Sequence, residues 1–354
     1  MPADFSAGIP IRIIDRLDAM SFIQGYAVHA AGAELLPFKY KTGELNPYDV
    51  EVRISHCGVC HSDAHLIDND WGISQYPLIP GHEIVGMVSA VGSAVLGLEV
   101  GTRVGIGWQA NSCGRCEWCR KGEENLCASA QPTCVHRHGG FADAIRVNAR
   151  FAVPLPESLE SDTTAPLLCA GITVYSPLRS LGINPTSRVG IIGLGGLGHL
   201  AVQFARVFGA EVTAISTSAS KEQEARELGA HHFVNSRESK SIKELTGSFD
   251  LIISTITADL DWAAFVQTLR PHGTLCFVGA PEKPISLPGF PLISVQRSVC
   301  GSNTGSPGRI AEMLDVAARH NIRARIESFR MSEANQALGR LRKGQLRYRA
   351  VLGN

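Results

Sequence analysis

The sequence has no excess charge of either sign and no long hydrophobic run. Its 33 basic residues are balanced by 33 acidic residues, so the formal net charge is zero. Such a chain has no long-range field that would gather polyanions, which argues against nucleic acid or an anionic membrane as its main partner. Its uninterrupted apolar runs all fall short of the ~18 residues that a membrane-spanning helix needs.

The first twenty residues also lack the basic start and apolar stretch of a secretory signal. We therefore expect a cytoplasmic protein. No internal repeat or low-complexity tract is present, and 44% hydrophobic with 19% charged residues is typical of a globular chain. At 354 residues the chain exceeds one ordinary core, because domains usually hold roughly 100–200 residues. Two structural units are expected.

Three regions differ in how their apolar residues are spaced. Residues 20–164 contain short apolar runs between glycines and prolines, which predict the strands of a turn-rich domain at 50–54, 84–88 and 103–107. Residues 165–301 alternate strands (189–192, 211–216, 251–253, 275–278) with helices (198–208, 221–228). This alternation is typical of a parallel, doubly wound sheet. The tail, 302–354, has a predicted helix (309–319) and a closing strand (349–352), and we expect it to rejoin the first region.

A glycine motif opens the first helix of the alternating region. Gly193, Gly195 and Gly198 satisfy the pattern G-x-G-x-x-G between a strand and a helix, with Gly196 and Leu197 inside it. The first glycine permits a tight turn, the second lets the backbone approach a pyrophosphate, and the third allows close packing of helix on strand. A flexible turn is the alternative. The flanking strand and helix favour a dinucleotide site.

The end of the next strand distinguishes NADP from NAD. NAD sites usually place an acidic residue there, ~20 residues past the glycines, to bind the ribose 2′-hydroxyl. This chain has Ser216, Thr217 and Ser218 instead, followed by Lys221. Hydroxyl and ammonium groups donate to phosphate oxygens, and no carboxylate repels them. The residues could simply form a turn and a helix cap, but they favour NADP(H).

Four of the ten cysteines are concentrated in one short segment. Their spacing is Cys113-x2-Cys116-x2-Cys119-x7-Cys127. Four thiolates close a tetrahedral shell with no open position, which predicts a structural zinc in a lobe over residues 113–127. Free or disulfide-bonded thiols are the alternative. Similar four-cysteine zinc lobes also occur in modules that bind nucleic acids or proteins.

A catalytic zinc needs fewer protein ligands and one open position. Candidate ligands are Cys57, Cys60, His82 and Cys169. Each is ambiguous when considered alone. Cys57 and Cys60 could be a redox pair, His82 could be a buried histidine with ordinary hydrogen-bond partners, and Cys169 could be a core residue.

Taken together, these motifs resemble the zinc-containing medium-chain alcohol dehydrogenases. The resemblance rests on Cys60-His61-Ser62-Asp63, on the pattern that begins Gly81-His82-Glu83, on the four-cysteine lobe and on the glycine motif. The segments 68–77 and 166–175 narrow it to the cinnamyl-alcohol-dehydrogenase-like branch, close to bacterial NADPH-dependent aldehyde reductases. One departure is Ser-Thr-Ser at 216–218, where that branch usually has Ser-Ser-Ser.

The resemblance implies a Rossmann sheet (165–301) inserted into a β-rich GroES-like catalytic domain (20–164 and 302–354). It covers the chain from about Met20 to Leu352, so residues 1–19 are expected to be a dispensable extension or the product of an over-called start codon. It also implies two zinc ions per chain, NADP(H), hydride transfer between this cofactor and an alcohol/aldehyde pair, and a homodimer paired through the cofactor domains.

The resemblance also assigns roles to single residues. It implies Cys60, His82 and Cys169 as catalytic zinc ligands, with Cys57 only a neighbour and Glu83 able to approach the zinc in place of water. Asp63 would orient His82. Ser62 and His65 would carry the alcohol proton. The implied cofactor contacts are the glycine motif, Ser216, Thr217, Ser218, Lys221, Val278 and Arg349.

Two other functions remain open from the residues. A polyol- or threonine-type dehydrogenase of the same fold would normally prefer NAD, and a non-catalytic NADPH sensor would have no use for an open zinc site. Trp71, Trp108 and Phe290 are expected as walls of an apolar aldehyde pocket, although such aromatics often only fill a core.

Overall fold

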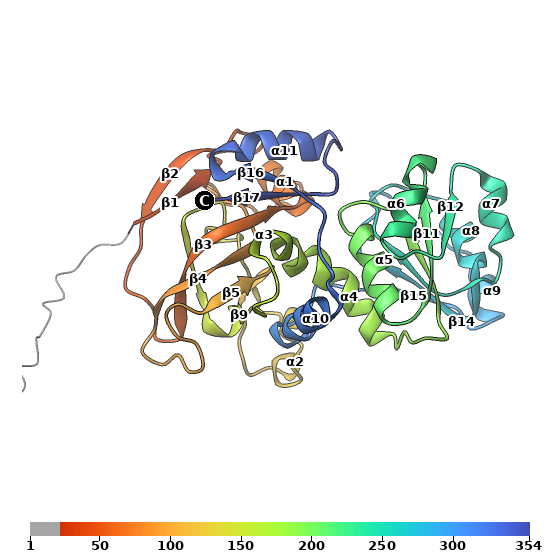
Figure 1. Ribbon diagram of the computed structural model, residues 1–354, viewed down its shortest axis with the longest axis horizontal. Coiled ribbons are helices and arrows are strands. Elements are labelled where there is room, and N and C mark those ends of the chain that lie inside the picture. Colours follow the sequence, from red (N-terminus) through yellow and green to blue (C-terminus); the bar gives the residue numbers. More distant parts are fainter. Residues whose placement is uncertain (1–21) are drawn as a thin grey trace, which may run out of the picture.

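The structure is a computed structural model that describes residues 22–354, in two lobes that lie side by side (Figure 1). One lobe is built on a seven-stranded sheet and the other on a six-stranded sheet. The predicted extension, 1–19, lies outside the described residues. The two-lobed α/β architecture agrees with the fold class predicted from the sequence.

The seven-stranded sheet forms the core of the first lobe. Its order is β16-β17-β3-β4-β5-β9, with β8 also paired to β3. Along β3 buried residues alternate with more exposed ones, as a strand with one face on a core requires. The strands of this lobe are β1 (Phe22–Ala27), β2 (Leu36–Lys41), β3 (Asp49–Val59), β4 (Glu83–Val91), β5 (Arg103–Ile106), β6 (Gln109–Asn111), β7 (Gln131–Pro132), β8 (Ala144–Asn148), β9 (Val153–Pro154), β16 (Ile326–Arg330) and β17 (Arg349–Gly353).

The C-terminal tail returns to this first sheet. β17 pairs antiparallel with β3 and parallel with β16. The sequence predicted only one helix and one strand in the tail, and this prediction was incomplete, because β16 and α11 (Ala334–Arg342) are also present. α11 buries a narrow face of two leucines and two alanines, which gives a weak sequence pattern.

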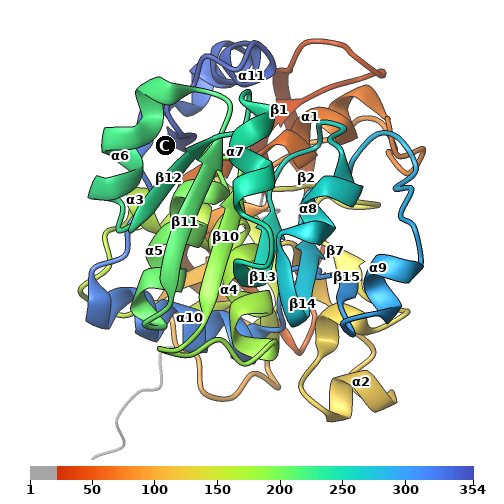
Figure 2. The same cartoon turned by 90° about the vertical axis from the view of Figure 1, so that its right-hand side faces the viewer.

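The six-stranded sheet is entirely parallel (Figure 2). Its strand order is β12-β11-β10-β13-β14-β15. The chain adds strands on one side of β10 first and on the other side afterwards, and a doubly wound sheet binds its ligand at the point where this order changes. Ile252 and Ile253 in β13 are fully buried, because helices cover both faces of the sheet. Its strands are β10 (Arg188–Ile192), β11 (Glu211–Ser216), β12 (His232–Asn235), β13 (Phe249–Ser254), β14 (Leu269–Phe277) and β15 (Ser298–Gly301).

The helices differ from the predicted ones mainly at their ends. The helix predicted at 221–228 is shorter, because a 3-10 turn at 219–221 precedes it. The helix predicted at 309–319 is longer: it begins two residues earlier, at Pro307, and ends one residue later, at His320. The helices are α1 (His61–Asp68), α2 (Glu117–Arg120), α3 (Ser161–Thr164), α4 (Ala170–Ser180), α5 (Gly198–Val207), α6 (Glu222–Glu227), α7 (Ser239–Glu244), α8 (Trp262–Gln267), α9 (Phe290–Ile293), α10 (Pro307–His320) and α11.

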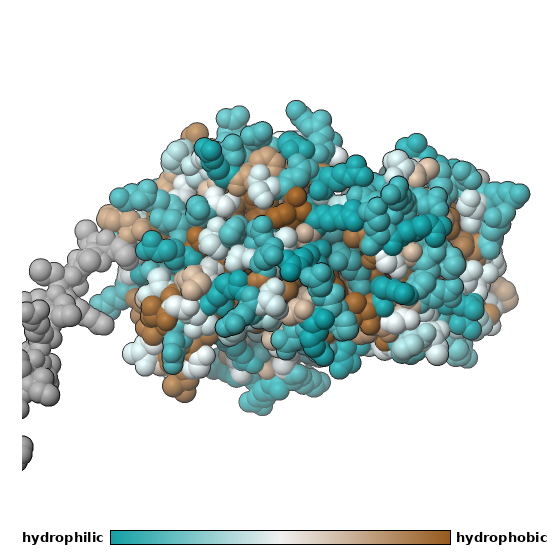
Figure 3. All heavy atoms as spheres, in the orientation of Figure 1, coloured by the Kyte–Doolittle hydropathy of each residue, from teal (hydrophilic) through white to brown (hydrophobic). Residues whose placement is uncertain are grey.

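The surface visible in Figure 3 is mostly hydrophilic, with hydrophobic residues scattered over it. Among residues 22–354, no helix combines the length and the apolar character needed to cross a membrane.

Candidate metal centres and cofactor site

Four potential metal ligands converge in a buried cluster. The sulfurs of Cys60 and Cys169, a ring nitrogen of His82 and a carboxylate oxygen of Glu83 all lie within 4.8 Å of one another. His82 Nε2 is 3.3 Å from the Cys169 sulfur. All four residues are buried. Sulfur and imidazole ligands at this spacing suit a tetrahedral zinc.

Each ligand of this cluster lies at the end of a regular element. Cys60 follows β3 and caps the start of α1. His82 and Glu83 lie at the start of β4, and Cys169 lies immediately before α4. The rigid elements, which come from distant parts of the chain, therefore fix the directions of these side chains.

Asp63 holds one side of the cluster. Its carboxylate accepts hydrogen bonds from the backbone N–H of Cys60 (2.9 Å), the backbone N–H of Gly81 (2.9 Å) and Nδ1 of His82 (3.0 Å). Because Nδ1 donates to Asp63, Nε2 of His82 is left as the acceptor atom that faces the two sulfurs. Asp63 thus fixes both the orientation and the tautomer of the imidazole.

Glu83 forms a buried ion pair with Arg349, the first residue of β17. Its second oxygen, Oε2, has no hydrogen-bond partner and is buried. Burial raises the pKa of Glu83 to about 7, although the guanidinium of Arg349 works against this shift. A buried carboxylate oxygen without a partner is costly, and a bound cation would satisfy it.

The two cysteines of the cluster influence each other. The hydrogen bond from Cys169, together with the charge of Arg349, holds the pKa of the Cys60 thiol well below its usual range. Burial lowers the pKa of His82, but the carboxylate of Asp63, the thiolate of Cys169 and hydrogen bonds together raise it, so the net shift is upward. The cluster therefore stabilises a thiolate, the form in which cysteine binds metals.

Cys57 is close to this cluster but does not belong to it. Its fully buried thiol donates to the neighbouring Gly58 carbonyl (3.6 Å), and burial raises its pKa well above the usual value. The sequence left open whether Cys57 and Cys60 form a redox pair. In the structure the sulfur of Cys60 faces Cys169 and His82 instead.

Two tryptophans adjoin the cluster. The ring of Trp108 meets His82 edge-on at 4.9 Å, and Trp71 meets Trp108 at 6.1 Å. The ring of Trp71 also lies 5.3 Å from His65, whose Nδ1 donates to Asp70 (2.7 Å). Phe290, the third aromatic expected in the pocket, is 78% exposed on α9.

Ser62 and His65 both lie on α1, the helix that starts at Cys60. The hydroxyl of Ser62 is 3.8 Å from the Cys60 sulfur, and the side chain of His65 is 38% exposed. One side chain therefore touches the buried cluster and the other reaches solvent.

The glycine motif forms the turn between β10 and α5. Gly193 has a φ of +90°, and a Cβ on Gly198 would lie 1.7 Å from the Gly193 carbonyl oxygen, so only glycine fits at either position. A Cβ on Gly195 would meet open space. The turn thus leaves backbone exposed at a helix N-terminus, where a pyrophosphate can bind.

Lys221 links this turn to the end of β11. Its ammonium donates to the carbonyl of Leu194 (2.7 Å) within the glycine motif. Ser216 is buried, and its hydroxyl accepts from the backbone N–H of Ser218. Thr217 is exposed. Val278 follows β14, and its N–H donates to Ser254 (3.0 Å).

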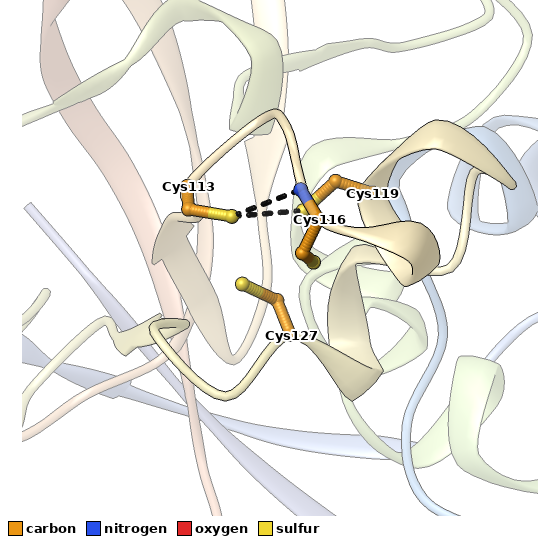
Figure 4. Close-up of side chains that lie close together, drawn as sticks. All are labelled: Cys113, Cys116, Cys119 and Cys127. Atoms are coloured by element: carbon orange, nitrogen blue, oxygen red, sulfur yellow. Dashed lines mark hydrogen bonds between the residues drawn. The ribbon is translucent and has the colours of Figure 1, made fainter.

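The four-cysteine segment forms a compact lobe around α2. Figure 4 shows the side chains of Cys113, Cys116, Cys119 and Cys127 pointing toward a common centre. Their sulfurs lie within 4.8 Å of one another, and none of these cysteines is in a disulfide. The backbone N–H groups of Arg115 and Cys116 lower the pKa of Cys113 to about 6. This donor set suits a closed zinc site.

Sequence reasoning missed several residues that the structure places at these sites. Cys134 lies close to Asp63 and His82, and Thr255 donates to the Gly193 carbonyl. His199, directly after the glycine motif, is fully buried. Only His199 carries a signal in the sequence, namely its position next to Gly198; the others are brought to the site by the fold.

Both lobes match known protein families. Residues 46–157 match the alcohol dehydrogenase GroES-like domain, and residues 196–319 match the zinc-binding dehydrogenase family. The aldehyde reductase AdhA of Synechocystis sp. is 47% identical over 332 residues, which cover 94% of this chain and 99% of the relative. The chain belongs to the zinc-containing alcohol dehydrogenases. The fold class predicted from the sequence, a Rossmann sheet inserted into a GroES-like domain, is thereby confirmed.

Solved structures assign this alcohol dehydrogenase to a branch of the family. A cinnamyl alcohol dehydrogenase of Sorghum bicolor has a TM-score of 0.90 and 39% identity, and the match covers 94% of this chain and 98% of that one. The Helicobacter pylori enzyme, solved with NADP(H), has a TM-score of 0.87 and 32% identity at the same coverage. The predicted membership of the cinnamyl-alcohol-dehydrogenase-like branch is also confirmed.

Proposed function

We propose that this alcohol dehydrogenase reduces aldehydes with NADPH at a zinc ion held by Cys60, His82 and Cys169. One observation carries the proposal: Arg349 touches both halves of the site. Its guanidinium pairs with Glu83, and its side chain lies 2.9 Å from where a Cβ of Gly196 would be. A metal site and a dinucleotide turn joined by one side chain suit hydride transfer between a dinucleotide cofactor and a carbonyl substrate.

The three ligands leave a fourth position for the substrate, as a catalytic zinc requires. A zinc ion bound there supplies a Lewis acid that polarises the carbonyl oxygen of the aldehyde. Glu83 lies within 4.8 Å of these three residues, and its unpaired oxygen would be able to approach the metal in place of water. Asp63 keeps the Nε2 lone pair of His82 directed at the metal position.

Ser62 and His65 would move the proton that the reaction consumes. The Ser62 hydroxyl, which lies next to the Cys60 sulfur, would donate to the product oxygen, and the partly exposed His65 would exchange that proton with solvent. The ion pair with Asp70 would keep His65 oriented.

The preference for NADPH rests on the end of β11. Ser216, Thr217, Ser218 and Lys221 offer hydroxyl and ammonium donors to a 2′-phosphate, and no acidic side chain takes the place of the ribose acceptor. The NADP(H) complex of the Helicobacter pylori relative supports this choice. Val278 and Arg349 would be further contacts, to the nicotinamide and pyrophosphate ends.

We further propose an apolar aldehyde as substrate, against a wall formed by Trp71 and Trp108. The name of the Synechocystis relative, an aldehyde reductase, supports this substrate class. Cys113, Cys116, Cys119 and Cys127 would hold a second, structural zinc. Association into a homodimer through the cofactor domains stays a prediction from the family.

The direct test measures NADPH and NADH oxidation with simple aldehydes such as benzaldehyde and butanal. We expect aldehyde-dependent oxidation with a clear preference for NADPH, and two zinc ions per chain by metal analysis. Cys169→Ser should lose roughly one of these ions together with the activity, whereas the stability that comes from the Cys113–Cys127 lobe should persist. No aldehyde-dependent oxidation by fully zinc-loaded enzyme would refute the proposal.

A further inference from the structure

Two cysteines outside the metal clusters face each other on the cofactor-binding sheet. Cys276 on β14 and Cys300 on the edge strand β15 are direct partners in the parallel register. Both pack on the same hydrophobic core, so their side chains project from the same face of the sheet. Neighbouring strands lie about 4.8 Å apart, which is inside the roughly 4.4–6.8 Å between Cα atoms that a disulfide spans.

The two thiols already interact. They hydrogen-bond to each other, and neither is in a disulfide. The bond from Cys276 lowers the pKa of Cys300 to about 7, while the same bond and burial raise that of Cys276. Cys300 is also partly exposed, whereas Cys276 is fully buried. The more accessible sulfur is therefore the one that carries the reactive thiolate.

We propose that Cys276 and Cys300 are an oxidation site, at which a hydroperoxide converts the two thiols into a reversible disulfide. The Cys300 thiolate attacks one peroxide oxygen, the O–O bond breaks, and a sulfenic acid forms as hydroxide leaves. The Cys276 sulfur then attacks the Cys300 sulfur, the S–O bond breaks, and water leaves. The two thiols lose two electrons and two protons, and hydrogen peroxide is reduced to two molecules of water.

The same geometry makes the disulfide easy to reduce. A relaxed disulfide brings its Cβ atoms to about 3.8 Å, closer than adjacent strands normally hold them. The bond would therefore draw β14 and β15 together, and such a strained bond has a more oxidising potential than a structural one. This pair suits a reversible modification better than a permanent crosslink.

The test uses the folded, zinc-loaded enzyme, treated with limited hydrogen peroxide, alkylated and digested with trypsin without reduction. Arg297 separates the two cysteines, so a disulfide joins two different tryptic peptides. We expect mass spectrometry to find these peptides linked, the link to disappear with dithiothreitol, and the zinc content to stay unchanged. Oxidation confined to the zinc-cluster cysteines, with Cys276 and Cys300 still reduced, would overturn the proposal.

Two variants separate the chemical steps. Cys300→Ser, a change at a partly exposed position, should fold normally, keep full activity under reducing conditions and lose the crosslink. Cys276→Ser should leave Cys300 without its partner, so that a sulfenic acid accumulates and is trapped by dimedone. A wild-type enzyme in which Cys300 proceeds to sulfinic acid without crosslinking would contradict the assignment of Cys276. These readouts do not depend on the aldehyde or on the coenzyme.

Discussion

His82 can present one ring nitrogen to a metal only because the other nitrogen is occupied. Asp63 accepts from Nδ1 and also from two backbone N–H groups, so its carboxylate cannot turn away without leaving buried donors unpaired. The motif Cys-His-Ser-Asp at 60–63 thus contains one proposed ligand, Cys60, and the residue that orients another proposed ligand, His82.

In the proposed function, the coenzyme preference depends on the end of one strand, β11. Ser216→Asp would repel the 2′-phosphate of NADPH and offer the ribose of NADH an acceptor. Losing one charge-assisted bond costs about 1.5–3 kcal/mol, and repulsion adds to this, so the NADPH-to-NADH ratio of kcat/KM should fall by more than roughly tenfold. Steady-state kinetics with both coenzymes measure this ratio. Aldehyde preference should not change; an unaltered ratio would exclude Ser216 from the phosphate site.

His199 makes the stability of the cofactor lobe depend on pH. Burial lowers its pKa to about 3, while Nδ1 donates to the Gly195 carbonyl and Nε2 accepts from the N–H of Arg325. The folded protein therefore holds the neutral ring, and the unfolded chain binds the proton more readily. Stability is lost as the pH falls below about 6.5, by roughly 1.4 kcal/mol per pH unit.

His199→Gln should remove this dependence. Between pH 7.5 and pH 5.5 the wild type should lose about 1 kcal/mol more stability than the variant, as measured by the Tm of zinc-loaded protein at both values. His320→Gln, a change at an exposed end of α10, is the matched control and should follow the wild type. Parallel Tm curves for wild type and His199→Gln would show that burial of His199 does not affect the pH response.

Among the elements, the lobe around α2 has the least apolar support. α2 is four residues long and buries only Cys119, so packing alone cannot hold it in place. Zinc binding would supply the missing free energy, because structural zinc binding is coupled to folding.

Cys113→Ser should therefore reduce the zinc content from two ions to one and make the lobe sensitive to proteases. Activity should fall as a consequence of instability, with the aldehyde KM of the remaining folded enzyme close to that of the wild type. Metal analysis and limited proteolysis test this expectation. A variant with full zinc content and unchanged protease resistance would show that the lobe does not depend on a metal.

On the scale of the whole molecule, Glu224 links the two lobes. It lies on α6 of the cofactor lobe and pairs with Arg325 (2.9 Å) and Arg347 (3.1 Å), which flank β16 and β17 of the tail. Its side chain is only 10% exposed, so removing its charge leaves two cations beside a largely buried amide.

Glu224→Gln should lower the Tm by several degrees, corresponding to about 1–3 kcal/mol. Glu227→Gln is the control, because Glu227 pairs with Arg325 alone and is half exposed, so its loss should change stability by less than about 1 kcal/mol. Calorimetry of both variants distinguishes a specific link from a general charge effect. Equal shifts in the two variants would contradict the specific role of Glu224.

The features of this protein that could be predicted from its amino-acid sequence are those that rest on local pattern. Strands such as β10 and β11, and the glycine turn that follows β10, could be predicted locally. The spacing of the apolar residues, the turn residues and the start of the helix all lie within one short segment. The four-cysteine lobe is similarly local. The tail strand β16 and helix α11 were missed, because their apolar patterns are weak without the sheet and helices they pack on.

Which residues from distant parts of the chain come into contact depends on tertiary packing. Cys60, His82 and Cys169 were ambiguous individually, and the family resemblance rather than spacing linked them; the fold brings their side chains within 4.8 Å. The contact of Arg349 with both Glu83 and the glycine turn, and the facing thiols of Cys276 and Cys300, depend on strand pairing between segments far apart in the chain. Local sequence determines backbone conformation, whereas contacts across a core depend on how all the elements pack.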